Sequence, residues 1–92
     1  MKHLSSKDNL IKAILSLSDE EECVNFLEDI LTIKETDSMA QRLEVAILLK
    51  EGKKFQEIVE KTGASTATIS RVNRCILYGN GGYETVINRI KG

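Results

Sequence analysis

The chain has 92 residues, no proline and no tryptophan, and its formal net charge of −1 at pH 7 gives no overall signal of a nucleic-acid-binding protein. Its length suits one domain, residues 1–92, and leaves no room for a second. Aromatic residues make up only 4% of the chain, and together with abundant leucine and isoleucine this composition predicts an all-α fold. A domain this small buries a modest fraction of its surface, which favours help from a partner chain.

Cysteine and histidine usage argues against a metal site and a disulfide framework. Cys23 and Cys75 lie far apart in the sequence, and His3 is the only histidine. Two isolated thiols fit a reducing cytosol. The N-terminus lacks the apolar region of a signal peptide, and no apolar run approaches the length of a membrane span. The sequence therefore predicts a cytoplasmic protein that binds neither metal nor membrane.

The first predicted helix begins with a cap at Ser6 or Asp8 and runs to about Ser16, after an N-terminal stretch, Met1 to Ser6, that we expect to be frayed. Its apolar residues recur at helical spacing and share one face. They are Leu10, Ile11, Ile14 and Leu15.

A second helix is predicted from Ser18 to about Thr32 or Lys34. Ser18 and Glu21 match the S-x-x-E capping box, in which each side chain accepts a hydrogen bond from the other residue's backbone N–H. The apolar residues form two stripes, and a helix that is apolar on two sides is buried on two sides. In a chain this short, we expect the second covering surface to come from another subunit. The stripes are Val24, Leu27, Ile30 and Leu31 on one side, and Phe26 and Ile33 on the other.

The region from Asp19 to Asp37 is strongly acidic, with eight acidic residues against one basic residue, Lys34. The run from Asp19 to Glu22 lies where the positive end of the second helix's dipole is expected, so capping and solvation explain it. A docking surface for a protein partner is the alternative interpretation of the same run.

A third helix is predicted to begin with a cap at Thr36 or Asp37 and to run to about Glu51. Its centre, Val-Ala-Ile-Leu-Leu at residues 45–49, is apolar nearly all round, so we expect it to be the core helix. Gly52 suits the C′ position that ends a helix.

The segment from Gly52 to Cys75 predicts a helix-turn-helix over about residues 54–77. Apolar residues at helical spacing flank Gly63, which can supply a turn with positive φ. An ordinary helical hairpin is the alternative. The second helix opens with small hydroxyl residues that can enter a major groove, where a structural helix would more often expose Glu and Lys. The apolar residues are Ile58 and Val59 before the glycine, and Ile69 and Val72 after it.

Positive charge is concentrated in this same segment, where five basic residues stand against two acidic ones. Phosphate contact requires such a local excess, whatever the net charge of the chain. The residues expected to contact double-stranded DNA are Thr66, Ala67, Thr68 and Ser70 at base edges, Arg71 and Arg74 at guanine or the backbone, and Lys53, Lys54 and Gln56 at phosphates.

A final helix is predicted from Tyr83 to Ile90, with Val86 and Ile87 sharing its inner face with Ile90, which gives six helices in all. The connection before it, Gly79 to Gly82, is either sharp or flexible. It follows no strand and precedes no lysine, so it does not match a phosphate-binding loop. No nucleophile and base are available as a set, and we therefore expect no catalytic site.

Several short motifs occur in a defined order along the chain: Leu31-Thr32, Gln41-Arg42, Leu48-Leu49-Lys50-Glu51-Gly52, Gly63-Ala64 and Ala67-Thr68-Ile69-Ser70-Arg71. In this order they resemble the Trp repressor family over about residues 15–90, most strongly in the helix-turn-helix. The ending from Tyr78 to Tyr83 is more similar to the YerC/YecD group of Trp repressor-related proteins than to the tryptophan-sensing repressors. The resemblance implies an intertwined homodimer of six-helix subunits, whose two reading heads face successive major grooves.

The resemblance also places Thr32, Arg42 and Arg71 at positions that line the corepressor pocket of tryptophan-sensing members. There two arginines sandwich the indole, one of them holds the ligand carboxylate, and a threonine carbonyl holds the amino group. Val72 departs from the pattern of the tryptophan-sensing members, which have a glycine at this position that leaves space for the indole ring. A valine side chain would fill much of that space, and overpacking a site costs about 1–3 kcal/mol. Cys75 replaces a serine near the amino group. No ligand is the favoured interpretation, with another small molecule or tryptophan as alternatives; phosphate contact or an ion pair with the acidic region is the competing role of both arginines.

These patterns together predict a sequence-specific DNA-binding regulator of transcription that acts as a homodimer, with repression as the expected sign and no tryptophan corepressor. The alternative is a protein-interaction or assembly module on the same fold, without a specific operator.

Overall fold

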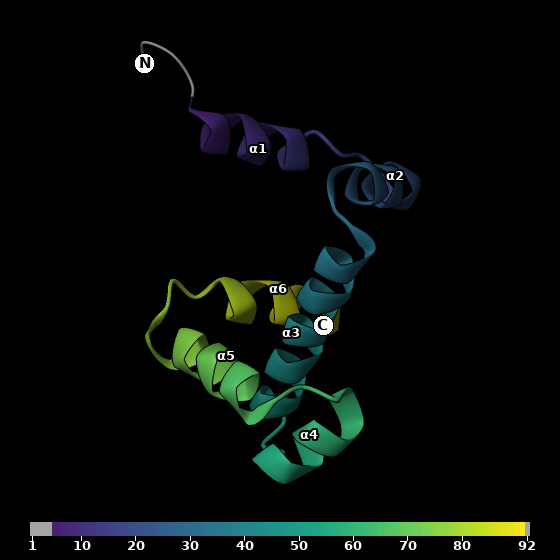
Figure 1. Ribbon diagram of the computed structural model, residues 1–92. Coiled ribbons are helices and arrows are strands. Elements are labelled where there is room, and N and C mark those ends of the chain that lie inside the picture. The colour runs from purple at the N-terminus through teal and green to yellow at the C-terminus, as the bar shows by residue number, and fades with distance from the viewer. Residues whose placement is uncertain (1–4, 92) are drawn as a thin grey trace. The chain divides into compact units, whose positions relative to one another are not determined.

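The computed structural model describes residues 5–91, which form six helices and no strand (Figure 1). The predicted all-α, six-helix architecture is confirmed. None of the helices within this range is both long and apolar enough to cross a membrane. The chain divides into two compact units, residues 1–36 and 37–92. That all 92 residues form one domain stays a prediction. The helices are α1 (Ser6–Leu15), α2 (Glu20–Ile30), α3 (Ile33–Lys50), α4 (Phe55–Thr62), α5 (Thr66–Tyr78) and α6 (Gly82–Lys91).

Helix α1 is capped by Ser5, one residue earlier than predicted. The Ser5 Oγ accepts a hydrogen bond from the Asp8 backbone N–H at 3.1 Å, and Asp8 Oδ2 accepts one from the Ser5 N–H at 3.2 Å. Asp8 is therefore the partner in a capping box, and the predicted caps Ser6 and Asp8 are wrong. Of the stretch expected to be frayed, residues 1–4 lie outside the described range, whereas Ser5 and Ser6 form the cap and the first turn.

Helix α2 is also capped one residue away from the predicted position. Asp19 accepts a hydrogen bond from the Glu22 N–H at 2.9 Å, and Glu22 Oε1 accepts one from the Ser18 N–H at 2.8 Å. The predicted pairing of Ser18 with Glu21 is therefore wrong. An ionised carboxylate at the helix N-terminus benefits from the helix dipole as well as from the hydrogen bond, which favours Asp19 as the cap.

Helix α3 begins several residues earlier than predicted, because Thr32 caps it. Thr32 Oγ1 accepts from the Glu35 N–H at 3.1 Å, and Glu35 Oε1 accepts from the Thr32 N–H at 2.9 Å. The predicted caps Thr36 and Asp37 lie inside α3, and α2 ends at Ile30 instead of continuing to Thr32 or Lys34.

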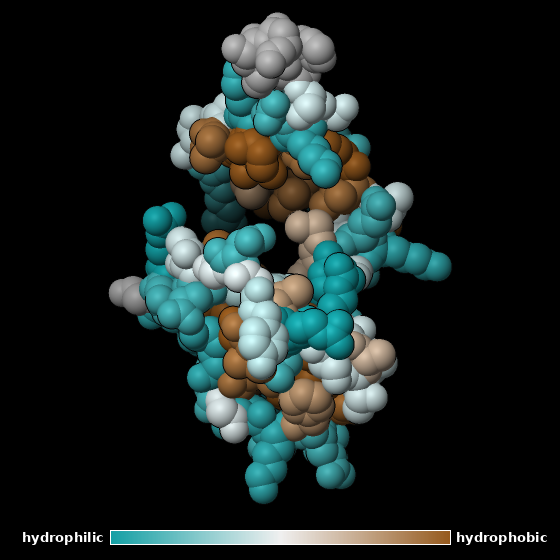
Figure 2. Space-filling model, turned by 90° about the vertical axis from the view of Figure 1, so that its left-hand side faces the viewer, coloured by the Kyte–Doolittle hydropathy of each residue, from teal (hydrophilic) through white to brown (hydrophobic). Residues whose placement is uncertain are grey.

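The N-terminal unit has no buried side chain in α1 or α2. The predicted apolar face of α1 is present but uncovered, and Leu15 is 78% exposed. In α2, Phe26 and Leu27 are half-buried, whereas Val24 and Ile30 are exposed. Figure 2 shows hydrophobic side chains, in brown, gathered on the surface of the N-terminal unit.

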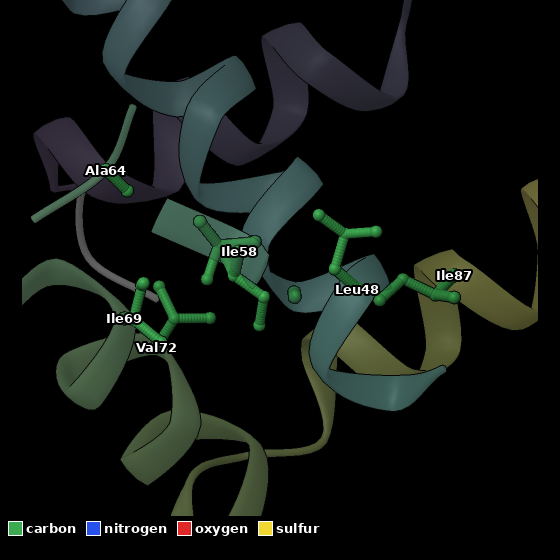
Figure 3. Close-up of a cluster of buried hydrophobic side chains, with 8 residues drawn as sticks. Leu48, Ile58, Ala64, Ile69, Val72 and Ile87 are labelled. Carbon is green, nitrogen blue, oxygen red and sulfur yellow. The ribbon is translucent and has the colours of Figure 1, made fainter. Parts of the chain in front are cut away.

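The C-terminal unit contains every buried hydrophobic side chain among the described residues (Figure 3). The apolar centre of α3 lies at this core, as predicted. Of the inner face predicted for α6, Ile87 is buried, whereas Val86 and Ile90 are 46% and 58% exposed and are wrongly predicted. Tyr83, one turn before Ile87, packs against the core instead. The buried set is Val45, Ala46, Leu48, Ile58, Ala64, Ile69, Val72 and Ile87.

The end of α3 turns the chain into the helix-turn-helix. Gly52 has a φ of +84°, its N–H donates to the Leu49 carbonyl, and the Lys53 N–H donates to the Leu48 carbonyl at 3.1 Å. This pair of bonds is a Schellman motif, which satisfies carbonyls that the helix leaves without partners. The predicted role of Gly52 as the C′ residue is confirmed.

Candidate nucleic-acid interface

The turn between α4 and α5 is built from Thr62, Gly63, Ala64 and Ser65. Gly63 adopts a φ of +74°, which confirms the predicted positive-φ turn. The Thr62 hydroxyl donates to the Ile58 carbonyl at 2.7 Å and accepts from the Ala64 N–H at 3.1 Å. One side chain therefore ties the last turn of α4 to the connection, and Ala64 is only 2% exposed beneath it.

Two further contacts set the orientation of the two helices. Gln41 of α3 donates from Nε2 to the Thr62 carbonyl at 3.1 Å, in a partly buried position. Ser65 caps α5, because its Oγ accepts from the Thr68 N–H at 3.1 Å. Helix α5 packs on both α4 and α6, and Ile58 of α4 faces Ile69 and Val72 of α5 in Figure 3. The angle between the two helices is therefore fixed by a contact between buried apolar side chains and by the hydrogen bonds of the turn.

The surface of α5 separates into two faces. Ile69 and Val72 are 0% and 1% exposed and point into the core. A row of exposed residues runs along the opposite side at spacings of three and four, which places them on one face of a helix. We name this row the outward stripe; it consists of Ala67, Ser70, Arg71, Arg74 and Tyr78.

The four residues predicted to approach base edges do not share one environment. Ala67 and Ser70 belong to the outward stripe, and Thr66 is exposed at the first residue of α5. Thr68 is half-buried, and its hydroxyl oxygen accepts a hydrogen bond from the Ser65 Oγ at 3.1 Å. Thr68 therefore helps to hold the start of α5.

Arg71 and Arg74 are exposed and carry charge that no neighbouring acid neutralises. The ion pairs among residues 5–91 join Lys50 to Glu84 and Lys91 to Glu51, and neither arginine takes part. The sequence has no acidic residue from position 61 to position 83. The first turn of α5 is also free of acidic residues, so the positive end of its dipole faces solvent unopposed.

The residues predicted to bind phosphates lie just before α4 and in its first turn. Lys53 is the half-buried residue that follows the Schellman glycine, and Lys54 is exposed at the N-cap position of α4. The Lys54 N–H donates to Glu57 Oε1 at 3.1 Å, which fixes the start of α4. Gln56 is exposed in the first turn. These three residues stand at the start of the helix-turn-helix, and the outward stripe stands on its second helix.

Of the residues assigned to a corepressor pocket by resemblance, Thr32, Arg42 and Val72 are engaged within the chain. The Thr32 carbonyl accepts hydrogen bonds from the Thr36 N–H at 3.0 Å and from the Thr36 hydroxyl at 3.2 Å. Arg42 is half-buried and donates from Nη1 to the Ser38 Oγ at 3.0 Å. Neither Arg42 nor Arg71 takes part in the two ion pairs of the C-terminal unit, and Val72 is part of the core. Across the same range, no group of three His, Cys, Asp or Glu side chains could hold a metal ion.

Sequence reasoning did not include Tyr78 among the site residues, although it ends the outward stripe and is 82% exposed. The signal was present in the sequence, because positions 67, 70, 71, 74 and 78 follow one helical face.

Comparison with known proteins agrees with the motif pattern. The model of the Trp repressor protein family matches residues 5–91. Uncharacterized protein YerC of Bacillus subtilis is 56% identical over 84 residues, which cover 91% of this chain and 81% of that protein. A crystal structure of a TrpR like protein from Eubacterium eligens is 54% identical, with a TM-score of 0.86 over 90% of this chain and 86% of that one. A candidate Trp repressor from Staphylococcus aureus is 42% identical, with a TM-score of 0.90 over 97% and 89%. The resemblance stated from the motifs is thus confirmed, and the chain belongs to the Trp repressor family.

Proposed function

We propose that the protein is a cytoplasmic regulator of transcription that binds specific DNA sequences as a homodimer through α4 and α5, and that it acts as a repressor. The outward stripe of α5 carries this proposal. It presents small residues near the start of the helix and two unpaired arginines farther along it, on a helix whose opposite face is locked into the core. Membership of the Trp repressor family supports the same function.

The order of residues along the stripe suits insertion of the N-terminal half of α5 into a major groove. Ala67 and Ser70 are short enough to let the backbone approach base edges. Ala67 offers a methyl group for the thymine methyl, and Ser70 offers a hydroxyl that can donate or accept. Arg71 and Arg74 can reach guanine or the backbone, and a bidentate contact to guanine contributes about 1–3 kcal/mol of discrimination.

Lys53, Lys54 and Gln56 would position this head on the phosphate backbone. They lie next to the start of α4, and the Schellman motif at Gly52 holds the chain that carries them. Phosphate contacts fix register and orientation without reading sequence. This division of labour explains why the helix-turn-helix is basic while the chain as a whole is slightly acidic.

The homodimer is supported by the N-terminal unit. Its helices have apolar faces but no buried side chain, so a second copy of the chain could bury them. Two reading heads related by a two-fold axis would recognise a palindromic site with half-sites about one helical turn apart.

We further propose that tryptophan is not the corepressor. The Val72 side chain occupies core volume at the position where the tryptophan-sensing pattern has glycine, and it is 1% exposed. The Thr32 carbonyl already accepts two hydrogen bonds, which uses both of its lone pairs. An amino group at that carbonyl would have to displace one of them. We favour a helix-turn-helix that is held in place by its own packing and needs no small-molecule corepressor.

Recovery of the genomic DNA fragments bound by the purified protein, with and without tryptophan, tests this function. We expect a palindromic sequence to be enriched equally in both conditions. Enrichment that requires tryptophan would contradict the proposal for the pocket, and no enrichment at low salt would contradict DNA binding itself.

A protein-interaction module without an operator is the second candidate, with the exposed acidic run from Asp19 to Glu22 as its docking surface. Asp19 and Glu22 already serve the capping of α2, which weakens this interpretation. Salt dependence separates the two functions. The logarithm of the DNA affinity falls linearly with the logarithm of the salt concentration, with a slope of about −0.9 per neutralised phosphate. Absence of any DNA binding at low salt would favour the second candidate.

A further inference from the structure

Tyr78 is the last residue of α5 and ends the outward stripe, one helical turn beyond Arg74. Its exposure of 82% would be unremarkable by itself, because single apolar residues are common on protein surfaces. Its direction is informative. The phenol shares its helix face with Arg74 and Arg71, which lie one and two helical turns before it.

The position of Tyr78 along the helix indicates which part of DNA it would meet. An α-helix rises about 1.5 Å per residue, so Tyr78 lies about 16 Å beyond Ala67 along the axis. The major groove is about 12 Å wide. If Ala67 and Ser70 stand at base edges, Arg71 and Arg74 remain within or at the rim of the groove, and Tyr78 lies beyond its rim, at the level of the phosphates.

The end of α5 is held at this point by tight backbone geometry. The Gly79 N–H donates to the Cys75 carbonyl at 2.8 Å, and a Cβ added at Gly79 would collide with that carbonyl oxygen. Only a glycine allows the chain to leave the helix directly after Tyr78 by this route. The phenol therefore projects from the last residue of a fixed helix end.

We propose that Tyr78 is a positioning contact to DNA, in which the phenol hydroxyl donates a hydrogen bond to a phosphate oxygen outside the groove that α5 enters. Tyrosine hydroxyls are among the groups that bind phosphates in protein–DNA interfaces. The two unpaired arginines on the same face, and the lack of acidic residues from position 61 to position 83, provide the positive surroundings that this contact needs. This inference rests on the proposed function of α4 and α5.

The chemistry gives the contact a signature that differs from those of lysine and arginine contacts. A phenol is neutral, so its loss releases no counterion and leaves the salt dependence of binding unchanged. A phosphate contact also carries no sequence information, so its loss weakens operator and unrelated DNA by the same factor.

The test compares the full-length chain with Tyr78→Phe, which removes only the exposed hydroxyl, and with the control Tyr83→Phe. Tyr83 is half-buried against the core and lies off α5. Fluorescence anisotropy with a labelled duplex of mixed sequence, and with the recovered palindrome, is measured over a series of salt concentrations. For Tyr78→Phe we expect about tenfold weaker binding to both duplexes, since hydrogen bonds to charged groups contribute at that scale. The salt slope should equal that of the parent, and Tyr83→Phe should bind like the parent.

The inference is overturned if Tyr78→Phe binds like the parent, or if it loses only the preference for the palindrome. A second variant, Tyr78→Ala, examines an interface between two copies of the chain. If it weakens subunit association in sedimentation while Tyr78→Phe leaves DNA affinity intact, the ring serves dimer packing and the phosphate contact is wrong. If the parent protein binds neither duplex at low salt, the proposed function itself is wrong, and so is the Tyr78 contact that rests on it.

Discussion

The two units of the chain have equally well-defined helices but very different interiors. In residues 37–91, α3 to α6 surround eight buried apolar side chains. In residues 5–36, three capping arrangements start helices at Ser5, Asp19 and Thr32, yet α1 and α2 bury nothing completely. Good local signals therefore do not distinguish a unit that packs on itself from one that leaves its apolar faces uncovered.

The difference follows from the limited stability of short helices. Helices shorter than about 12–15 residues are marginal in water, and most of their stability in proteins comes from packing. Helices α1 and α2 have 10 and 11 residues. The C-terminal unit can hold the geometry of its helix-turn-helix with its own side chains, whereas the N-terminal unit leaves its apolar faces uncovered. The proposed roles in assembly and in DNA reading thus fall to different parts of the chain.

The largest expected effect comes from making the uncovered face of α1 polar. Leu10 and Ile14 lie one turn apart and are 43% and 49% exposed in the single chain. If a second copy buries them, each side chain contributes about 1.5–3 kcal/mol to association. The double substitution Leu10→Ser, Ile14→Ser should weaken the dimer at least about 100-fold in sedimentation equilibrium and lower the helical signal in circular dichroism.

The matched control is Asn9→Ser, an exposed polar residue of the same helix. It should leave the dimer intact. A double variant that sediments like the parent, or a parent that is monomeric at all concentrations, would break the assignment of the N-terminal unit to assembly.

A core substitution in the C-terminal unit should have the next largest effect. Ile58 is 0% exposed and stands between α4 and α5. Removing most of its side chain leaves a cavity, and such changes cost about 2–5 kcal/mol. Urea denaturation of Ile58→Ala should show this loss of unfolding free energy. Leu77→Ala, at a residue that is 61% exposed in the same unit, should change it by no more than about 0.5 kcal/mol. Equal losses for the two variants would contradict the core described for this unit.

The sequence predicted the C-terminal unit better than the N-terminal boundaries, for a physical reason. Gly52 and Gly63 are the residues that positive φ requires, so they mark the ends of α3 and α4 without ambiguity. At the N-termini of helices several good caps compete. Ser5 competes with Ser6, and Asp19 with Ser18. Only the hydrogen bonds of the folded chain decide between such neighbours, so caps were misplaced by one to a few residues.

The spacing of the candidate site residues could be predicted from the sequence, but the exposure and hydrogen bonds of each side chain could not. The spacing of Ala67, Ser70, Arg71 and Arg74 already places them on one face. That Thr68 turns instead toward Ser65 depends on where the cap of α5 falls, which the sequence left open. The exposure of Val86 was missed for a similar reason, because the side of α6 that faces the core depends on where α5 lies. Contacts between elements decide such cases, and periodicity within one element does not.

Substitution of the arginines in the outward stripe should weaken DNA binding without changing the stability of the protein. Arg71 and Arg74 take part in no ion pair among the described residues, so Arg71→Ala and Arg74→Ala should leave the melting temperature unchanged. Each should weaken binding to the recovered palindrome by about 1–3 kcal/mol in a mobility-shift titration. The control is Arg89→Ala, an exposed arginine of α6 outside the helix-turn-helix. If Arg89→Ala weakens binding as much, or if both stripe variants bind like the parent, the stripe is not the reading surface.

The smallest expected effect concerns the surface of the C-terminal unit, where Lys50 Nζ of α3 lies 2.7 Å from Glu84 Oε1 of α6. The hydrogen bond from Lys50, followed by its positive charge, lowers the pKa of Glu84 from the ordinary value of 4.5. A carboxyl with a lowered pKa in the folded state stabilises the protein above its unfolded pKa, and that contribution disappears as the pH falls through the folded value.

The melting temperature of Glu84→Gln should therefore lie slightly below that of the parent at neutral pH, and the two should converge on acidification below the lowered pKa. Since Glu84 is mostly exposed, salt should reduce the difference as well. Glu60→Gln, at an exposed glutamate that joins neither ion pair of the described residues, should show no such convergence. A Glu84→Gln difference that persists unchanged at acidic pH would mean that the ionised carboxylate is not its cause, and would contradict a stabilising role for this ion pair.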